Sequence, residues 1–507
     1  MMNLEIKKAL VSVWDKRGLG DFCQTLAKFN IEIYSSGGTW RFLEARGIKA
    51  QNIEKITGFS QLLGGRVKTL HPLIHAAILA RKDDARHMAE LKKIGISPFD
   101  LVVVNLYPFL EKRRENLTLE QMQEYIDIGG PTMLRAAAKN FQSVAVISSP
   151  SQYKMVAGEL VGERGKLSLA LRKKLAGEAF AFVSQYDSAI AEFLAASNKE
   201  TKRVVFRRHH SLRYGENPQQ KAALYKIGGE VSFEQLGGKE LSYNNFLDLD
   251  AALSLVRYFK RLPAACVIKH GNPCGVALAG NLALAYRKAF MSDALSSFGG
   301  IIGLNKEVDE KTARAVIKSG FREAVIAPGF SREALDILRE KKNLRLIKAD
   351  FKKHNSNQQI RKTAFGYLIQ EEDLLVIDNH KLQIVTKKKP TAREIEDLLF
   401  AWFVAKYTKS NAIVIAKNLR TLGIGCGQPS RIGAMEIAIR KSCQSTQGAV
   451  LASDGFFPKE DNLELAKSAG IKALIQPGGS LKDKDLIKLA DKLNLSMIFT
   501  SLRHFRH

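Results

Sequence analysis

The sequence predicts an α/β protein with two domains joined by a short linker. Short apolar segments typical of buried strands alternate with segments of helical periodicity along most of the chain. A length of 507 residues is also too great for a single hydrophobic core. Residues 198–203 are polar and lack apolar periodicity. We therefore expect domains over 1–197 and 204–507, with 198–203 as the linker.

The first domain begins with two strand–loop–helix units. Strands are expected at 10–13 and 31–34, and they precede helices at 19–29 and 40–45. The second loop, Ser35-Ser-Gly-Gly-Thr39, has the glycines and hydroxyls that cradle phosphate at a helix N-terminus. A plain tight turn explains this loop equally well, so both interpretations stay open.

Three further segments of the first domain carry polar side chains at positions suited to a ligand. Residues 64–72 place an arginine, a lysine and a threonine behind two glycines, which suits phosphate. The strand at 101–105 ends on Asn105. The expected helix 132–140 carries Lys139, for which an ordinary solvated position is the alternative.

In the second domain, a predicted buried strand at 264–268 ends on Lys269 and His270. Glycines and a proline are expected to turn the chain sharply through 271–275. In α/β proteins, chemistry gathers beyond the carboxyl ends of strands. A histidine that moves protons beside an ammonium that stabilises negative charge therefore suggests a catalytic pair. A surface turn with two basic residues is the alternative.

A similar order of elements recurs after a lysine-rich connection near 380–392. Strands are expected at 411–416 and 422–425, followed by a helix that ends near Arg440. We interpret 204–380 and 381–507 as two related α/β subdomains of slight sequence identity.

The composition indicates a cytoplasmic protein. No apolar run has the length of a membrane span, and the N-terminal residues lack the apolar core of a signal peptide. Five cysteines, an odd number, lie mostly in apolar segments, as is typical of reduced thiols. The net charge of +27 suits anionic partners but is spread along the chain without a basic tail, so we do not expect nucleic acid to be the partner.

Cys274, close to His270, suggests a comparison with zinc-dependent deaminases. Their signature needs His-x-Glu and Pro-Cys-x-x-Cys, whereas Asn272 stands in place of the glutamate and Ala277 in place of the second cysteine. No metal is therefore predicted. The sequence also lacks a P-loop, and it has no dinucleotide-binding glycine fingerprint in the required context.

Taken together and in order, the polar motifs resemble the bifunctional AICAR transformylase/IMP cyclohydrolase family of purine biosynthesis. The resemblance runs from Ala9 to His507. Its anchors in the first domain are Ser35–Thr39, Arg66–Pro72, Asn105–Phe109, Ile126–Pro131 and Ala136–Asn140. Those in the second domain are Leu212–Pro218, Lys269–His270, Ser296–Gly299, Lys409–Asn411, Gly427–Arg431, Ser453–Pro458 and Leu502–His507.

The resemblance implies a methylglyoxal-synthase-like (MGS-like) first domain for the cyclohydrolase and two zinc-free, cytidine-deaminase-like subdomains for the transformylase. It implies formyl transfer from 10-formyltetrahydrofolate to AICAR, giving FAICAR, and then ring closure of FAICAR to IMP with loss of water. It also implies a homodimer whose transformylase sites draw residues from both chains.

The resemblance also assigns roles to individual residues. Lys139 would be the proton donor/acceptor of the cyclohydrolase, and His270 the general acid/base of the transformylase. Lys269 would stabilise the oxyanion or help to protonate the departing folate nitrogen. The cyclohydrolase nucleotide would contact Trp14, Asp15, Lys16, Ser36, Gly37, Gly38, Thr39, Arg66, Val67, Lys68, Thr69, Val104, Asn105, Asp127 and Ile128. AICAR would contact Arg213, Tyr214, His270, Gly299, Glu323, Asn411, Arg431 and Arg503, and the folate would contact Ile432, Phe456, Asp461, Ser480 and Leu481.

Three positions depart from the family pattern. Trp14 stands where serine is usual, Gln219 replaces a histidine, and Gly271 replaces a common alanine. We expect both activities to survive, because the residues proposed for proton transfer are present. The alternatives are a monofunctional transformylase with a drifted first domain and a basic RNA-binding protein on the same fold.

Overall fold

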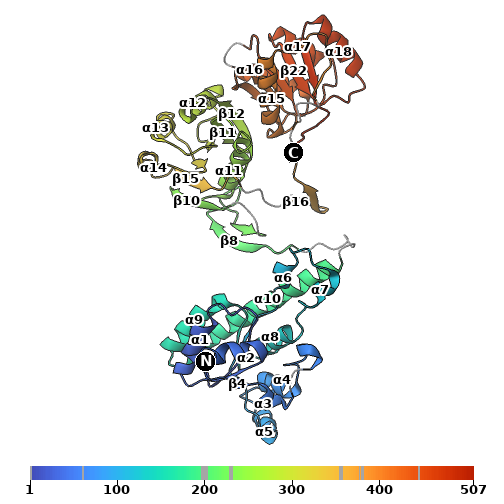
Figure 1. The fold of residues 1–507 in the computed structure, drawn as a ribbon. Helices are drawn as coiled ribbons and strands as arrows, with labels where there is room; N and C mark the ends of the chain where they lie inside the picture. The colour runs from blue at the N-terminus through green and yellow to red at the C-terminus, as the bar shows by residue number, and fades with distance from the viewer. Residues whose placement is uncertain are drawn as a thin grey trace. The chain divides into compact units, whose positions relative to one another are not determined.

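The structure is a computed structural model that describes residues 3–59, 62–195, 204–227, 232–352, 358–375, 377, 382–442 and 446–507. The expected linker at 198–203 lies outside these residues. The chain divides into two compact units, Met1–Arg203 and Val204–His507 (Figure 1). Among the described residues, no helix has the combination of length and hydropathy needed to cross a membrane.

The first unit contains a five-stranded parallel sheet of order β4-β3-β2-β5-β6. Its strands are β2 (Lys8–Ser12), β3 (Glu32–Ser35), β4 (Gln51–Asn52), β5 (Leu101–Val104) and β6 (Ala145–Ile147), and β1 (Leu4–Glu5) pairs separately with β7 (Lys166–Leu167). The helices are α1 (Leu19–Lys28), α2 (Gly37–Glu44), α3 (Glu54–Thr57), α4 (Pro72–Leu79), α5 (Ala85–Lys93), α6 (Phe109–Lys112), α7 (Leu119–Gln123), α8 (Gly129–Lys139), α9 (Tyr153–Gly162) and α10 (Leu169–Leu194), with 3₁₀ turns η1 (Leu63–Gly65) and η2 (Pro150–Gln152).

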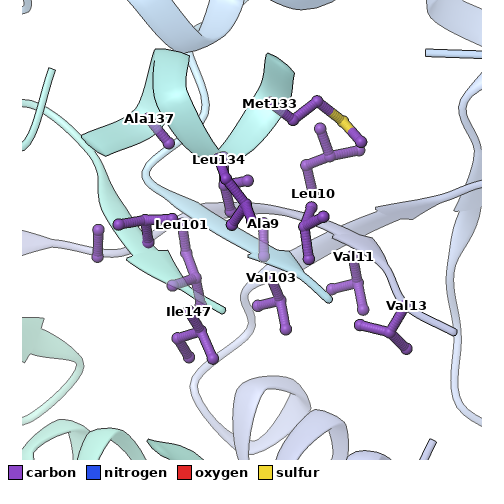
Figure 2. Close-up of a cluster of buried hydrophobic side chains, with 14 of the residues drawn as sticks. Ala9, Leu10, Val11, Val13, Leu101, Val103, Met133, Leu134, Ala137 and Ile147 are labelled. Carbon is purple, nitrogen blue, oxygen red and sulfur yellow. The ribbon is translucent and has the colours of Figure 1, made fainter. Parts of the chain in front are cut away.

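The core of the first unit lies against this sheet. All residues of β5 are buried, as expected for a central parallel strand covered on both faces. Figure 2 shows Leu134 and Ala137 of α8 beside Leu101 and Ala9 of the sheet, and all four belong to one buried cluster. This packing holds the N-terminal end of α8 close to the carboxyl ends of the strands.

The second unit contains two six-stranded sheets with the same topology. The first sheet has the order β10-β15-β14-β13-β11-β12, and the second has the order β18-β23-β22-β21-β19-β20. In the first sheet, β13, β14 and β15 are parallel to one another, whereas β11 and β10 pair antiparallel with the two outer strands of this group, and β12 pairs antiparallel with β11. In the second sheet, β21, β22 and β23 are parallel, and β19, β18 and β20 pair in the corresponding antiparallel way. The two halves of the second unit therefore share one strand order, as two related α/β subdomains would.

The elements of the second unit follow the same order in both halves. The first half contains β10 (Phe233–Gly237), α11 (Tyr243–Val256), β11 (Ala264–Lys269), β12 (Asn272–Leu278), α12 (Leu282–Ser292), β13 (Ile301–Leu304), α13 (Glu310–Lys318), β14 (Ala324–Ala327), α14 (Arg332–Arg339) and β15 (Arg345–Ala349). The second half contains β18 (Gln383–Ile384), α15 (Ala392–Lys406), β19 (Ile413–Ala416), β20 (Thr421–Gly425), α16 (Arg431–Lys441), β21 (Val450–Ser453), α17 (Asp461–Ser468), β22 (Ala473–Gln476), α18 (Asp483–Lys492) and β23 (Ser496–Phe499). Two hairpins lie outside these sheets, β8 (Arg207–Leu212) with β9 (Ala222–Lys226) and β16 (Gln358–Thr363) with β17 (Gly366–Glu371).

The two halves of the second unit join along their hairpins. The N–H of Val276 in β12 donates to Oγ1 of Thr421 in β20 at 2.9 Å, and the N–H of Leu278 donates to the carbonyl of Leu419 at 2.9 Å. One buried apolar cluster also includes residues of α11 and β11 together with residues of α15 and β19. The two subdomains therefore share a core.

The expected sharp turn through 271–275 is wrong. The turn contains only His270 and Gly271, and the chain continues at once as β12. Pro273 fits there because β12 is the edge strand of its sheet, where a missing N–H is tolerated. Gly275 is a packing residue, because a Cβ there would lie 2.0 Å from the carbonyl oxygen of Ala289 in α12.

Candidate active sites

A cavity of about 610 Å³ opens at the carboxyl ends of β2, β3 and β5 in the first unit. Most of the residues expected to contact the nucleotide line it: Trp14, Lys16, Ser36, Gly38, Thr39, Arg66, Lys68, Thr69, Val104, Asn105, Asp127 and Ile128. Asp15, Gly37 and Val67 do not line it, although Asp15 lines an adjacent cavity of about 540 Å³. The strand ends thus bring together segments far apart in the sequence.

The glycine-rich loop begins α2 beside this cavity. Gly37 has a φ of 49°, a left-handed conformation that glycine adopts without steric cost. The Thr39 hydroxyl donates to the carbonyl of Val13 at 2.9 Å and accepts from the N–H of Val13 at 3.0 Å. Thr39 therefore ties the loop to the segment after β2, and the N–H groups of Gly37 and Gly38 at the start of α2 are placed to suit an anion.

Asn105 holds the 14–15 loop over the cavity. Its Oδ1 accepts from the N–H of Trp14 at 2.7 Å and of Asp15 at 2.9 Å, and its Nδ2 donates to the carbonyl of Asp15 at 2.9 Å. The indole of Trp14 is half exposed and meets the ring of Tyr107 edge-on, with ring centroids 5.2 Å apart. Trp14 thus lines the cavity with an aromatic ring that the usual serine would lack.

Asp127 brings a carboxylate to the cavity that Lys68 also lines. Its Oδ1 accepts from the N–H of Gly130 at 2.8 Å. Burial raises the pKa of the Asp127 carboxyl above its usual value, although the Gly130 N–H and the charge of Lys68 oppose the shift. Burial, and then the charge of Asp127, raises the pKa of Tyr107. An ammonium, a carboxyl and a phenol therefore lie along one cavity, a set able to hold and move protons.

Lys139 lies elsewhere on α8. The residues of α8 that line the cavity are at its N-terminal end, up to Met133, whereas Lys139 is the last residue of the helix and its side chain is exposed. The separation of six positions between residues 133 and 139 corresponds to about 9 Å along a helix axis. In this structure the expected proton donor/acceptor is outside the cavity lining.

Sequence reasoning missed part of the cavity lining. Tyr107 could have been found, because it stands two residues after Asn105 at the end of the same strand. For the others the sequence offers no comparable signal. The missed residues are Ser12, Val13, Gly64, Leu70, Tyr107, Gln123, Glu124, Ile126, Gly129, Gly130 and Met133.

Lys269 and His270 lie at the tip of the β11–β12 hairpin in the second unit. Lys269 pairs with Asn272 across the hairpin, and His270 and Gly271 between them have φ values of 54° and 73°. Two consecutive residues with positive φ are the mark of a tight type I′ hairpin turn. Nζ of Lys269 donates to the carbonyl of Phe298 at 2.8 Å, which fixes the ammonium, while the His270 side chain is exposed.

A polar network from the second half lies against this turn. The N–H of Lys409 donates to Oδ1 of Asn272 at 3.0 Å. Two residues later, Oδ1 of Asn411 accepts from Nη2 of the buried Arg431 at 2.7 Å. Nη1 of Arg431 pairs with Oδ1 of Asp454 at 2.5 Å. Arg431 is thus held by protein groups and orients Asn411.

The other residues expected at AICAR are spread over several elements. Glu323 precedes β14, and its Oε2 accepts from Nη1 of the buried Arg345 at 2.6 Å. The N–H of Gly299 donates to the carbonyl of Phe321 at 3.1 Å. The guanidinium of Arg213 lies over the ring of Tyr214, 4.6 Å from its centroid. Arg503 is exposed and lies over Phe505.

The residues expected at the folate are mostly at the surface of the second half. Phe456 is partly exposed and Leu481 is fully exposed, so both offer apolar surface. Ile432 is the second residue of α16 and Asp461 the first of α17, and the N–H of Ser480 donates to Oδ2 of Asp483 at 3.1 Å. Among the described residues, no group of three or more His, Cys, Asp or Glu side chains is arranged to hold a metal ion.

Comparisons with known proteins agree on one family. The family model described as AICARFT/IMPCHase bienzyme matches residues 137–441, and the one described as MGS-like domain matches residues 18–132. The bifunctional purine biosynthesis protein PurH of Caldicellulosiruptor bescii is 48% identical, with 99% of this chain and 100% of the relative covered. Proteins of the same name from Bacillus thuringiensis and Fusobacterium nucleatum are 46% and 47% identical at the same coverage. The chain belongs to the AICARFT/IMPCHase bienzyme family.

Proposed function

We propose that the chain catalyses the last two steps of IMP synthesis, with the cyclohydrolase in the first unit and the transformylase in the second. The observation that carries this proposal is that each unit offers its own set of reactive groups. The first unit has the cavity at the ends of β2, β3 and β5, and the second has the Lys269–His270 turn with its polar surroundings. We further propose that the protein acts in the cytoplasm on small anionic substrates.

In the transformylase reaction, the amine of AICAR attacks the formyl carbon of 10-formyltetrahydrofolate. This amine is a poor nucleophile because it is conjugated with the carboxamide, so its proton must leave as the new C–N bond forms. We assign that proton to His270, whose imidazole is exposed at the turn. The ammonium of Lys269, fixed on the Phe298 carbonyl, would stabilise the oxyanion or help to protonate the departing folate nitrogen.

Arginine and aromatic side chains would hold the two substrates. We propose that Arg213, Arg431 and Arg503 contribute to AICAR binding, Arg431 chiefly by orienting Asn411. The exposed ring of Phe456 would provide a flat apolar contact for the pterin of the folate. No metal takes part in this proposal.

In the cyclohydrolase reaction, the carboxamide nitrogen of FAICAR attacks its own formyl carbon, and the formyl oxygen leaves as water. Both reacting groups belong to one molecule, so positioning supplies much of the rate. Lys16, Arg66 and Lys68 give the cavity the positive charge that a nucleotide phosphate needs. We propose Lys139 as the proton donor/acceptor on the resemblance alone, and Lys68, Tyr107 and Asp127 as the groups that the cavity itself offers for proton transfer.

One coupled assay tests both halves of this proposal. The purified protein is supplied with AICAR and 10-formyltetrahydrofolate, and tetrahydrofolate and IMP are followed together. We expect both products from the wild type. His270→Ala should form neither product but should still convert supplied FAICAR to IMP. A wild type that accumulates FAICAR would contradict the cyclohydrolase half, and a His270→Ala variant that still releases tetrahydrofolate would contradict the role of His270.

We also propose that the protein is a homodimer with transformylase sites shared between two copies. Support comes from the β16–β17 hairpin, whose described side chains include the exposed Phe365, Tyr367 and Leu368. Such apolar surface is typical of a contact region. Mixing His270→Ala with Arg213→Ala protein tests the sharing. Activity that appears only on mixing supports it, and two inactive variants that stay inactive after subunit exchange contradict it.

A further inference from the structure

The turn that carries Lys269 and His270 has a counterpart in the second half of the unit. There, Lys417 and Arg420 pair across the β19–β20 hairpin through N–H to carbonyl bonds of 2.9 and 3.3 Å. The two residues between them, Asn418 and Leu419, have φ values of 56° and 54°. Both hairpins thus end in a two-residue left-handed turn that directly follows a lysine, but the second turn has no histidine.

Each turn is held by one carboxylate from the preceding long helix. Oδ1 of Asp248 in α11 accepts from the N–H of Gly271 at 2.6 Å, and its Oδ2 faces the N–H of His270 at 3.3 Å. In the second half, Oδ1 of Asp397 in α15 accepts from the N–H of Leu419 at 2.6 Å, and its Oδ2 accepts from the N–H of Asn418 at 2.8 Å. The two carboxylates are therefore equivalent in the repeat.

The helices place these carboxylates in the same way. Asp248 follows the first residue of α11, Tyr243, by five positions, and Asp397 follows the first residue of α15, Ala392, by five positions. Both helices begin with a capping box, formed by Ser242 in α11 and by Thr391 in α15. The clamp is thus part of the repeated framework, and only the first half has a reactive side chain on it.

We infer that Asp248 is a positioning residue for formyl transfer, which fixes the left-handed turn and thereby aims His270 at the reacting amine. This inference rests on the proposed role of His270. A histidine at positive φ is uncommon, so the conformation needs support from its surroundings. An ionised carboxylate that accepts two backbone N–H groups supplies that support with charge-assisted hydrogen bonds. Burial of Asp248 raises its pKa, while the N–H groups of Gly271 and His270 favour its ionised form.

Asp397 provides a matched control within the same unit. Its side chain is buried, whereas that of Asp248 is half-buried, so replacing Asp397 disturbs the framework at least as much. The turn that Asp397 holds carries no residue that the proposed mechanism uses. A loss specific to Asp248→Asn therefore cannot be ascribed to a general weakening of a hairpin turn.

The experiment compares Asp248→Asn, Asp397→Asn and the wild type as full chains. Transformylase kcat and KM for AICAR, conversion of FAICAR to IMP and thermal unfolding are measured on each sample. For Asp248→Asn we expect kcat to fall about tenfold or more, because small misplacements of a catalytic group are costly. Its KM for AICAR and its FAICAR conversion should stay within about twofold, because the other residues proposed to bind AICAR and the first unit are untouched. Asp397→Asn should keep its transformylase kcat within about twofold, whatever its unfolding temperature.

Equal losses of kcat in the two variants, or a normal kcat in folded Asp248→Asn, would overturn the inference. If Asp248→Asn does not fold, Asp248→Glu is measured instead, since it keeps the charge but displaces the acceptor. A folded Asp248→Glu variant with wild-type kcat would equally overturn the inference. Failure of the proposed function has a different signature, because His270→Ala would then retain formyl transfer.

Discussion

Replacing Gly130 by alanine tests whether the position of Asp127 matters for ring closure. A Cβ at residue 130 would lie 2.6 Å from Oδ2 of Asp127 and 2.6 Å from Cδ2 of Leu106. Ordinary contacts begin at 3.4 Å, so the carboxylate or the start of α8 must move by about 0.8 Å, the difference between the two distances. Misplacement by about 1 Å can reduce turnover about 100-fold, and we expect a loss of about 10- to 100-fold.

The assay follows IMP formation from supplied FAICAR, with AICAR formylation measured on the same sample. Formylation should stay unchanged, because it depends on the second unit. Gly158→Ala is the matched control, since Gly158 lies in α9 of the same unit and a Cβ there meets nothing within 4 Å. It should keep full activity and gain up to about 1 kcal/mol of stability. Cyclohydrolase activity of Gly130→Ala within about twofold of the wild type would refute the reasoning.

Three further predictions concern Lys139, Asp454 and Asp127. If Lys139 is the proton donor/acceptor, the rate of IMP formation falls at least about 100-fold in Lys139→Ala. If Lys139→Ala is fully active and Lys68→Ala is not, the proton transfer belongs to Lys68 in the cavity. Asp454→Asn should lower the free energy of unfolding by about 3–5 kcal/mol in urea titrations, because it leaves the buried charge of Arg431 without its carboxylate partner; an unchanged midpoint would contradict this. Burial raises the pKa of Asp127 in the folded protein above its value in the unfolded chain. The contribution of this group to the free energy of unfolding is therefore fully present below the unfolded-state pKa and is lost as the pH rises through the folded-state pKa. Asp127→Asn should therefore be more stable than the wild type at pH near 7, with the difference disappearing below pH of about 4, and an equal difference at both pH values would refute it.

The parts of the site that sequence could predict are those governed by local rules. Apolar runs and the polar residues that follow them correctly placed Ser36, Asn105 and Lys269 at strand ends. In the first unit, the parallel strands then gather Ser36 and Asn105 at one edge of the sheet. Lys269 ends β11, which is antiparallel to both of its neighbours, so this rule does not account for its surroundings. The order of motifs along the chain contributed the rest, because each motif alone is compatible with an ordinary turn.

The parts that sequence could not predict depend on contacts between distant segments. Residues 272–278 contain proline and glycine and are nevertheless a strand, because a helix backbone packs against Gly275 and the strand is at an edge. Helix α8 begins at Gly129, earlier than expected, and its first two residues are glycines because Thr69 and Asp127 leave no room for side chains there. Hydrophobic periodicity likewise could not reveal that Asp248 accepts a hydrogen bond from His270, which lies 22 residues later.

The seam between β12 and β20 limits how the second unit can be divided. Each strand is the edge of its own sheet, and an unpaired edge is a template for pairing with another chain. Here Ala277 and Arg420 bridge the two edges in antiparallel fashion, so each sheet protects the other. A fragment cut near residue 380 would expose both this edge and the apolar surface of α11. Expression of either half alone should therefore yield aggregates, and any engineering of this protein has to keep the pair of subdomains together.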